Sequence, residues 1–176
     1  MKISSRVITN IGLLIALSII LTRIASIRIA IGGIEGIRIG FGGLPIILGG
    51  IIFGPLAGGI IGGVADLLGY IINPIGAYMP HFTLTSALTG IIPALFLKIS
   101  RKDKLKILNL IMAIALGQII TSVLLVPYFL NMLFGISWRV IIIPRLVSVP
   151  INIVIYSLLI RLILIRYYNI SPLSSD

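Results

Sequence analysis

The sequence contains no cysteine, one histidine and four acidic residues among its 176 positions. Without cysteine, disulfide bonds and thiolate chemistry are excluded for this chain. So few histidines and acids leave little with which to build a metal site or a pair of general acid–base catalysts. Charged residues make up 10% and hydrophobic residues 59%, whereas a soluble domain carries about 25% charged residues. The composition predicts an integral membrane protein that is not an enzyme and uses no cofactor or metal.

The basic balance of the chain has a membrane explanation. A net charge of +10 in a soluble protein would point to nucleic acid. Here the basic residues flank apolar runs, where they orient a chain in a bilayer. We therefore expect the lipid bilayer as the surroundings and no nucleic-acid partner.

Six apolar runs predict an all-α membrane protein with six transmembrane helices in a single domain covering residues 1–176. The runs cover residues 7–24, 43–53, 55–72, 82–97, 105–127 and 144–165. The second and third count as two helices, because one helix over 44–72 would be about 43 Å long, against a hydrocarbon core of about 30 Å. The Gly54-Pro55 pair between them is also a strong turn signal.

The distribution of lysine and arginine predicts the orientation. The segment 98–106 contains five basic residues, and the positive-inside rule places it in the cytoplasm. Lys2 and Arg6 place the N-terminus on the same side, and six crossings return the C-terminus, with Arg161 and Arg166, to that side. Both termini are therefore expected in the cytoplasm.

The cations left on the outer side are all arginine. They are Arg23, Arg28, Arg38, Arg139 and Arg145. Because arginine grips carboxylates and phosphates bidentately, this bias predicts an anionic ligand that arrives from outside. Lipid headgroups are the alternative partners for some of these side chains.

A polar stripe on the last run is the strongest ligand signal. Arg145, Ser148 and Asn152 are spaced by three and four residues, so they share one helix face, which should point into the bundle. Gln118, Thr121 and Ser122 on the fifth run extend this polar surface. Arg145 is the residue best suited to an anionic group.

Glycine is concentrated in the first half of the chain. Gly50, Gly54, Gly58 and Gly62 recur every four residues, a spacing that lets membrane helices approach closely. We expect close packing of the second and third helices. Residues 27–43 form a polar, glycine-rich outer segment, which we interpret as a mobile loop that covers a ligand.

Asp66 is the acid at membrane depth. Such residues are costly and are functional candidates, although the interpretation that we favour is a structural partnership with an arginine or a helix end. The aromatic residues Tyr78 and Phe82 either stack on a flat heterocycle or belong to the interfacial belt.

Several strings resemble the folate-specific substrate-binding (S) component of energy-coupling factor (ECF) vitamin transporters. They are residues 38–46 (RIGFGGLPI), 53–58 (FGPLAG), 66–69 (DLLG), 74–78 (PIGAY), 82–84 (FTL), 144–146 (PRL) and 150–152 (PIN). The resemblance runs over about residues 8–165. His81 stands where that family is expected to have glycine.

The resemblance implies a six-helix subunit in the plasma membrane of a prokaryote that binds folate or a reduced folate from outside. Its implied partners are a transmembrane coupling protein, docked through Gly12 and Ala16 on the first helix, and two cytoplasmic ATPases. The substrate-binding residues expected from the stripe, the outer segments and the resemblance are Arg38, Phe41, Gly42, Tyr78, His81, Phe82, Thr83, Arg145, Ser148 and Asn152. An S component for another small vitamin and a self-powered proton-coupled transporter are the alternatives.

Overall fold

The computed structural model describes residues 5–23, 27–31, 34–74 and 78–170, with the two strands described by their backbone. Apolar helices dominate this part of the chain. The elements in order are α1 (Ser5–Arg23), β1 (Ile27–Ile31), β2 (Ile34–Ile39), α2 (Gly43–Phe53), α3 (Pro55–Ile72), α4 (Pro80–Ile99), α5 (Ile107–Gln118), the π-helical segment η1 (Ile119–Leu125), α6 (Val126–Phe134) and α7 (Trp138–Ile170).

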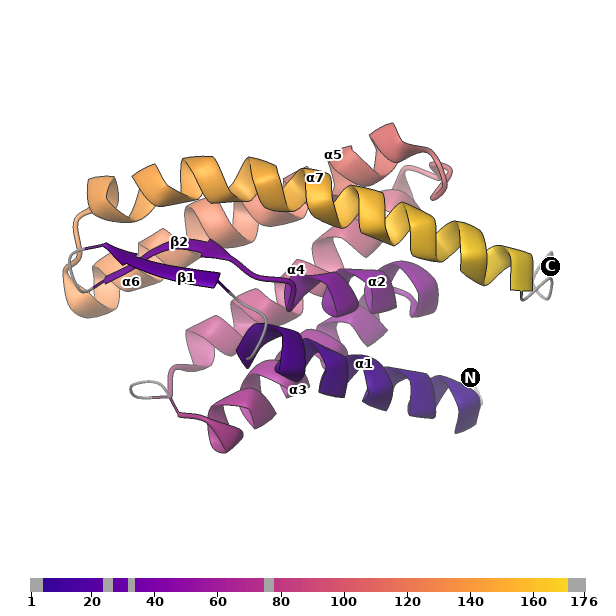
Figure 1. The fold of residues 1–176 in the computed structure, drawn as a ribbon, viewed down its shortest axis with the longest axis horizontal. Helices are drawn as coiled ribbons and strands as arrows, with labels where there is room; N and C mark the ends of the chain where they lie inside the picture. The colour runs from indigo at the N-terminus through magenta and orange to yellow at the C-terminus, as the bar shows by residue number, and fades with distance from the viewer. Residues whose placement is uncertain (1–4, 24–26, 32–33, 75–77, 171–176) are drawn as a thin grey trace.

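Five helical stretches are long and apolar enough to cross a membrane, and the shorter α2 completes a bundle of six (Figure 1). α5, η1 and α6 form one of the five, spanning Ile107–Phe134 without interruption. α2 and α3 have the bounds expected from the sequence. Gly54 separates them with φ of 100°, a conformation that favours glycine, and Pro55 opens α3 at a position where a missing N–H costs nothing.

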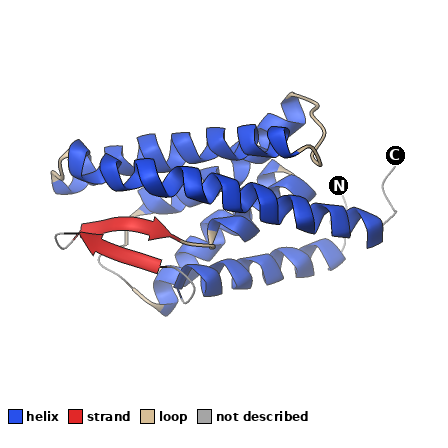
Figure 2. Ribbon diagram, turned by 45° about the horizontal axis from the view of Figure 1, so that its top comes forward, coloured by secondary structure: helices blue, strands red, loops and turns tan. Residues whose placement is uncertain are grey.

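The segment 27–43, interpreted from the sequence as a loop, contains an antiparallel hairpin instead (Figure 2). Ile27 pairs with Ile39 and Arg28 with Arg38, and the register shifts after Ile29, so Gly36 occupies a bulge. The reason is the alternation of isoleucine along β1 and, on either side of the bulge, along β2, which is a β-strand pattern. β2 lies against α7.

Two helices are longer than the sequence predicted because prolines do not end them. The fifth was expected to stop at Pro127 but continues to Phe134. The wider π-helical turn precedes this proline, and the Val126 N–H bonds back to the Thr121 carbonyl. The sixth was expected to start at Pro144, yet α7 begins at Trp138 and contains both Pro144 and Pro150. Membrane helices tolerate such prolines.

The glycine row brings α2 and α3 against α4. A Cβ atom added at Gly50 would lie 2.4 Å from the Gly90 carbonyl oxygen, and one at Gly62 would lie 2.3 Å from that of Ser86. Gly58 and Gly90 face each other in the same way, at 2.7 Å and 2.4 Å. The glycines therefore do more than join α2 to α3, because their main role is to let α4 approach both helices.

The lysine-rich end of the bundle is opposite the hairpin. The start of α1, the end of α7 and the α4–α5 connection lie at one end, and the hairpin lies at the other (Figure 1). In that connection, Lys104 Nζ donates a hydrogen bond to the Ile51 carbonyl at 2.9 Å. Burial lowers the pKa of Lys104. The basic loop is thus packed onto the end of α2.

A dense apolar core fills the half of the bundle near this lysine-rich end. The side chains with no exposed surface there come from four helices and include Ile47, Leu110, Ile160 and Leu164. The other half, nearer the hairpin, contains a cavity.

Candidate functional site

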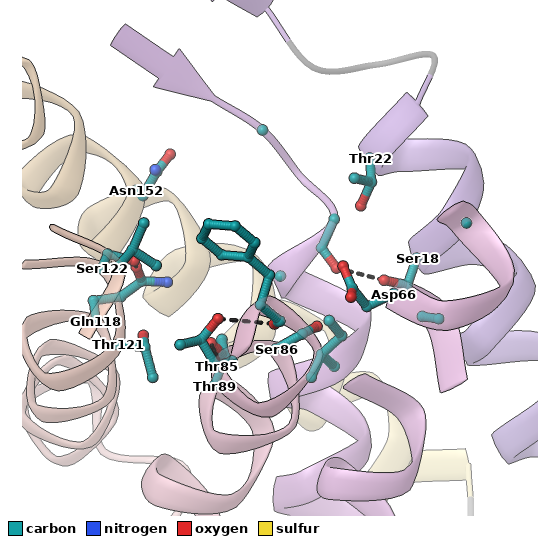
Figure 3. A pocket seen from close by; sticks show the side chains of 18 of the residues that line it. Ser18, Thr22, Asp66, Thr85, Ser86, Thr89, Gln118, Thr121, Ser122 and Asn152 are labelled. Atoms are coloured by element: carbon teal, nitrogen blue, oxygen red, sulfur yellow. Dashed lines mark hydrogen bonds between the residues drawn. The ribbon is translucent and has the colours of Figure 1, made fainter. Parts of the chain in front are cut away.

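The cavity has a volume of about 560 Å³ and is lined by all the helical stretches (Figure 3). Pockets that hold small organic ligands span about 300–1,000 Å³. Its walls come from the second half of α1, the start of α2, the second half of α3, the first half of α4, the π-helical region with α6, and the first two thirds of α7. These segments all lie toward the hairpin. Within the described residues, no three His, Asp or Glu side chains gather as metal ligands.

The predicted stripe on α7 lines this cavity. Arg145, Ser148 and Asn152 all contribute to the wall, and Ser148 is buried. Arg145 Nη1 donates to the Ser122 carbonyl of η1 at 3.1 Å. π-helical turns are often found at functional sites. Here Thr121 and Ser122 of the turn, with Gln118 at the end of α5, line the cavity (Figure 3).

A short strap from Gly40 to Gly43 closes one side of the cavity between β2 and α2. The Tyr156 hydroxyl donates a hydrogen bond to the Gly40 carbonyl, and Ser18 Oγ donates to the Gly42 carbonyl at 2.8 Å. A Cβ atom at Gly42 would lie 1.8 Å from Thr22 Oγ1. Gly42, a predicted site residue, is therefore needed for the close approach of the strap to α1.

Tyr156 is a lining residue that the sequence analysis missed. It is 4% exposed and comes from α7, four residues after Asn152. The signal was present, because this spacing continues the helix face of Arg145, Ser148 and Asn152.

A chain of hydroxyl groups ends on Asp66. Thr83 Oγ1 donates to Asp66 Oδ2 at 2.7 Å, and the Tyr78 hydroxyl lies 2.9 Å from Thr83 Oγ1. Because the single threonine proton is used on Asp66, Tyr78 must be the donor to Thr83. Asp66, Tyr78 and Phe82 line the cavity. Thr83 does not line it, but its hydroxyl bonds to both Asp66 and Tyr78.

Two predicted site residues lie elsewhere, and the side chain of a third is not described. Phe41 belongs to the strap, is half-buried and does not line the cavity. His81 packs on Phe129, with ring centroids 4.7 Å apart, and its buried Nδ1 has no hydrogen-bond partner among the described residues. Arg38 pairs through its backbone with Arg28 in the hairpin, but its side chain lies outside the described part of the structure.

A group of hydroxyl side chains in the cavity wall was not predicted from the sequence. They are Ser18 and Thr22 of α1 and Thr85, Ser86 and Thr89 of α4 (Figure 3). Thr85 and Thr89 are four residues apart and so share a helix face, a weak signal that the analysis did not use.

The residues predicted to dock a partner lie on the outer surface of the bundle. Gly12 and Ala16 are exposed on α1, and no atom lies within 4 Å of a Cβ built at Gly12. This glycine, unlike those of α2 and α3, packs against nothing in the described chain.

Comparison with known proteins identifies the family. Residues 2–169 match the family model described as "ECF-type riboflavin transporter, S component". The chain belongs to the S-component family of ECF transporters. It is 33% identical, over 84% of this chain and 81% of the relative, to the folate transporter FolT of Clostridium novyi (strain NT).

Two solved structures have the same fold as this S component. One is the crystal structure of FolT bound with folic acid, with a TM-score of 0.74 and 28% identity over 90% of this chain and 93% of that one. The other is the S component of a bacterial ECF transporter, with a TM-score of 0.70 and 25% identity over 94% and 96%. The predicted helical membrane bundle of the S-component type is confirmed, as is a role in transport and not in catalysis.

Proposed function

We propose that this S component binds folates in the cavity beneath the hairpin and serves in vitamin uptake. The observation that carries the proposal is the cavity wall, where an arginine on a polar stripe faces a chamber that also has aromatic side chains. The relatives support it, since the curated relative is named a folate transporter and one structural relative is a FolT bound with folic acid.

The two walls of the cavity suit the two ends of a folate. Arg145 and its neighbour Asn152 form a donor-rich wall for the glutamate carboxylates. Tyr78 and Phe82 line the opposite region beside Asp66, where a flat pterin ring can stack. Phe41, His81 and Thr83 then do not contact the folate directly.

The proposal includes partners that energise transport. Family membership implies association with an ECF complex, and we propose a transmembrane coupling protein with two cytoplasmic ATPases. The small, exposed pair Gly12 and Ala16 supports docking on α1, because close helix approach drives association in a membrane.

The proposed location is the plasma membrane of a prokaryote, with both chain ends and the lysine-rich end in the cytoplasm. The basic loop 98–106, the start of α1 and the end of α7 share that end of the bundle (Figure 1), as the positive-inside rule requires. The cavity then lies in the outer half of the bundle.

Binding by the isolated protein tests the ligand assignment. Purified protein in detergent is titrated with folic acid, without ATP, by calorimetry and by the fluorescence of Trp138. We expect saturable binding of one folic acid per chain. Saturable binding of riboflavin or thiamine with none of folic acid would overturn the assignment.

Riboflavin is the second candidate ligand, because the matching family model carries the description of a riboflavin transporter S component. Riboflavin offers a flat ring for the aromatic wall but no carboxylate for Arg145. Competition between riboflavin and folic acid in the same titration separates the two.

A self-powered proton-coupled transporter is the candidate from another class, and it would depend on Asp66. Asp66 lines the cavity and accepts a hydrogen bond from Thr83. Folate uptake into vesicles that contain this chain alone, driven by a proton gradient, would favour that class over an ATP-dependent one.

A further inference from the structure

We propose that Asp66 determines ligand specificity by binding the donor edge of a 2-amino-4-oxopteridine ring. This inference rests on the proposed folate function and names the group that reads the heterocycle. Asp66 lies in α3 and lines the cavity. It was left open from the sequence whether this acid pairs with an arginine. In the structure its partner is the Thr83 hydroxyl of α4.

The carboxylate of Asp66 has capacity for further donors. Each carboxylate oxygen accepts up to two hydrogen bonds, and among the described residues Thr83 supplies the one hydrogen bond to Asp66, on Oδ2. No lysine or arginine in the described part of the chain forms an ion pair with Asp66. A carboxylate within a membrane bundle is costly without donors, so a ligand that supplies two of them is strongly favoured.

The shape of the group selects the heterocycle. A carboxylate presents two parallel acceptors, which match two adjacent N–H donors. A pterin carries such a pair on one edge, the 2-amino group and N3–H. The flavin ring instead presents N3–H between two carbonyl oxygens, and those oxygens would face the carboxylate oxygens. Asp66 therefore favours a pterin and disfavours a flavin.

Neighbouring side chains hold the carboxylate and the ring in place. The chain from Tyr78 through Thr83 to Asp66 fixes the carboxylate rotamer. Tyr78 packs on Tyr70 with ring centroids 5.2 Å apart, which also orients the aromatic wall. A pterin bound to Asp66 then lies beside Tyr78 and Phe82, both of which line the cavity.

The other end of the ligand falls at Arg145. In Figure 3, Ser122 and Asn152 lie across the cavity from Asp66, and Arg145 is bonded to the Ser122 carbonyl. The cavity thus has an acceptor wall at Asp66 and a donor wall at Arg145. A ligand with N–H donors at one end and carboxylates at the other can therefore bind in one orientation, with its donors at Asp66 and its carboxylates at Arg145.

The test is a cycle of two proteins and two ligands. Wild type and Asp66→Asn are titrated with folic acid and with 2-desamino-2-methylfolic acid, which lacks the amino donor. Hydrogen bonds to charged groups are worth about 10- to 100-fold in affinity. We expect wild type to lose at least about tenfold for the analogue, and Asp66→Asn to lose at least about tenfold for folic acid while distinguishing the two ligands by less than about threefold.

Two variants control for indirect effects. Thr83→Val removes the hydrogen bond to Asp66 but keeps the carboxylate, so it should weaken folic acid less and retain the preference for the 2-amino group. Asp103→Asn makes the same chemical change in the α4–α5 connection, where Asp103 accepts a bond from the Leu105 N–H, and should leave both affinities unchanged.

The outcomes separate this inference from the proposed function. If wild type does not bind folic acid, the proposed function fails. If wild type binds folic acid but discriminates against the analogue by less than about threefold, Asp66 does not read the 2-amino group, and this result needs no folded variant. If Asp66→Asn weakens both ligands equally, its role is structural and the inference is overturned.

Discussion

Replacing Arg145 with alanine tests the donor wall of the cavity. Arg145 is half-buried on α7, lines the cavity and donates to the Ser122 carbonyl at 3.1 Å. A guanidinium has five N–H donors, and this contact orients the side chain in the cavity wall. Alanine removes both the orientation and the charge.

The expected loss follows from the partial burial. Truncating one partner of a buried, hydrogen-bonded charge pair costs about 2–5 kcal/mol. Arg145 is only partly buried, which places the loss near the lower bound, at about 2 kcal/mol or roughly 30-fold in Kd. Arg145→Lys should rescue little, because an ammonium lacks the planar fork that holds a carboxylate bidentately.

Calorimetric titration with folic acid measures both variants, and Arg139→Ala is the matched control. Arg139 lies six residues earlier on the same helix, is exposed and does not line the cavity, so its removal should leave Kd within about twofold, as for an ordinary surface substitution. Unchanged affinity in both Arg145 variants would refute the reasoning and assign this arginine to the structure of η1.

Three further changes test packing, docking and the strap. Gly90→Ala places a Cβ atom 2.4 Å from the Gly58 carbonyl oxygen, and the overpacking cost of about 1–3 kcal/mol should exceed the helix gain of about 1 kcal/mol; thermal unfolding in detergent should show a loss, whereas Gly12→Ala, with no atom within 4 Å, should show none. Gly12→Leu should keep folate affinity but sharply reduce uptake and co-purification of the coupling protein; lost binding with retained co-purification would place Gly12 inside the bundle. Tyr156→Phe removes the donor to Gly40 and should raise the Kd for folic acid about fivefold, as for one neutral hydrogen bond; an unchanged Kd would separate the strap from binding.

Local signals predicted the parts of the fold that local geometry decides. The α2–α3 break follows from Gly54 and Pro55, because the left-handed φ of 100° and the missing proline N–H both act within a few residues. The hairpin was not predicted, because the glycines in and around it are loop signals and the bulge at Gly36 interrupts the alternation of isoleucine along β2.

The lengths of the last two helical stretches depended on their surroundings. Pro127 and Pro144 end helices in water-soluble proteins, but in a bundle the π-helical turn and neighbouring helices accommodate them. Sequence rules for proline therefore predict both helical stretches too short, and the missing parts lie in the region that forms the cavity.

The candidate site likewise contains residues that a local sequence pattern predicts and a pairing that only the tertiary structure reveals. The stripe on α7 was predicted because its residues repeat along one helix and need no knowledge of tertiary structure. The pairing of Asp66 with Thr83 joins α3 to α4 across 17 positions in the chain, and no local pattern encodes it. The close approach that permits it comes from Gly58, Gly62 and Gly90, where main chains of the two helices touch.

The position of the cavity bears on how a bound ligand leaves. All its lining segments lie toward the hairpin, and the half near the lysine-rich end is closed by side chains with no exposed surface, among them Leu110, Ile160 and Leu164. Side chains packed to this density leave no path for a molecule the size of a folate. Passage through the bundle would require separating α5 from α7, at the cost of the buried apolar contacts between them. The strap between Gly40 and Gly43 is held by hydrogen bonds from Ser18 and Tyr156, and moving it does not require α5 and α7 to separate. Under the proposed function, we therefore expect the ligand to enter and leave at the hairpin end. We also expect that delivery to the other side of a membrane requires the proposed partners to reorient the whole bundle.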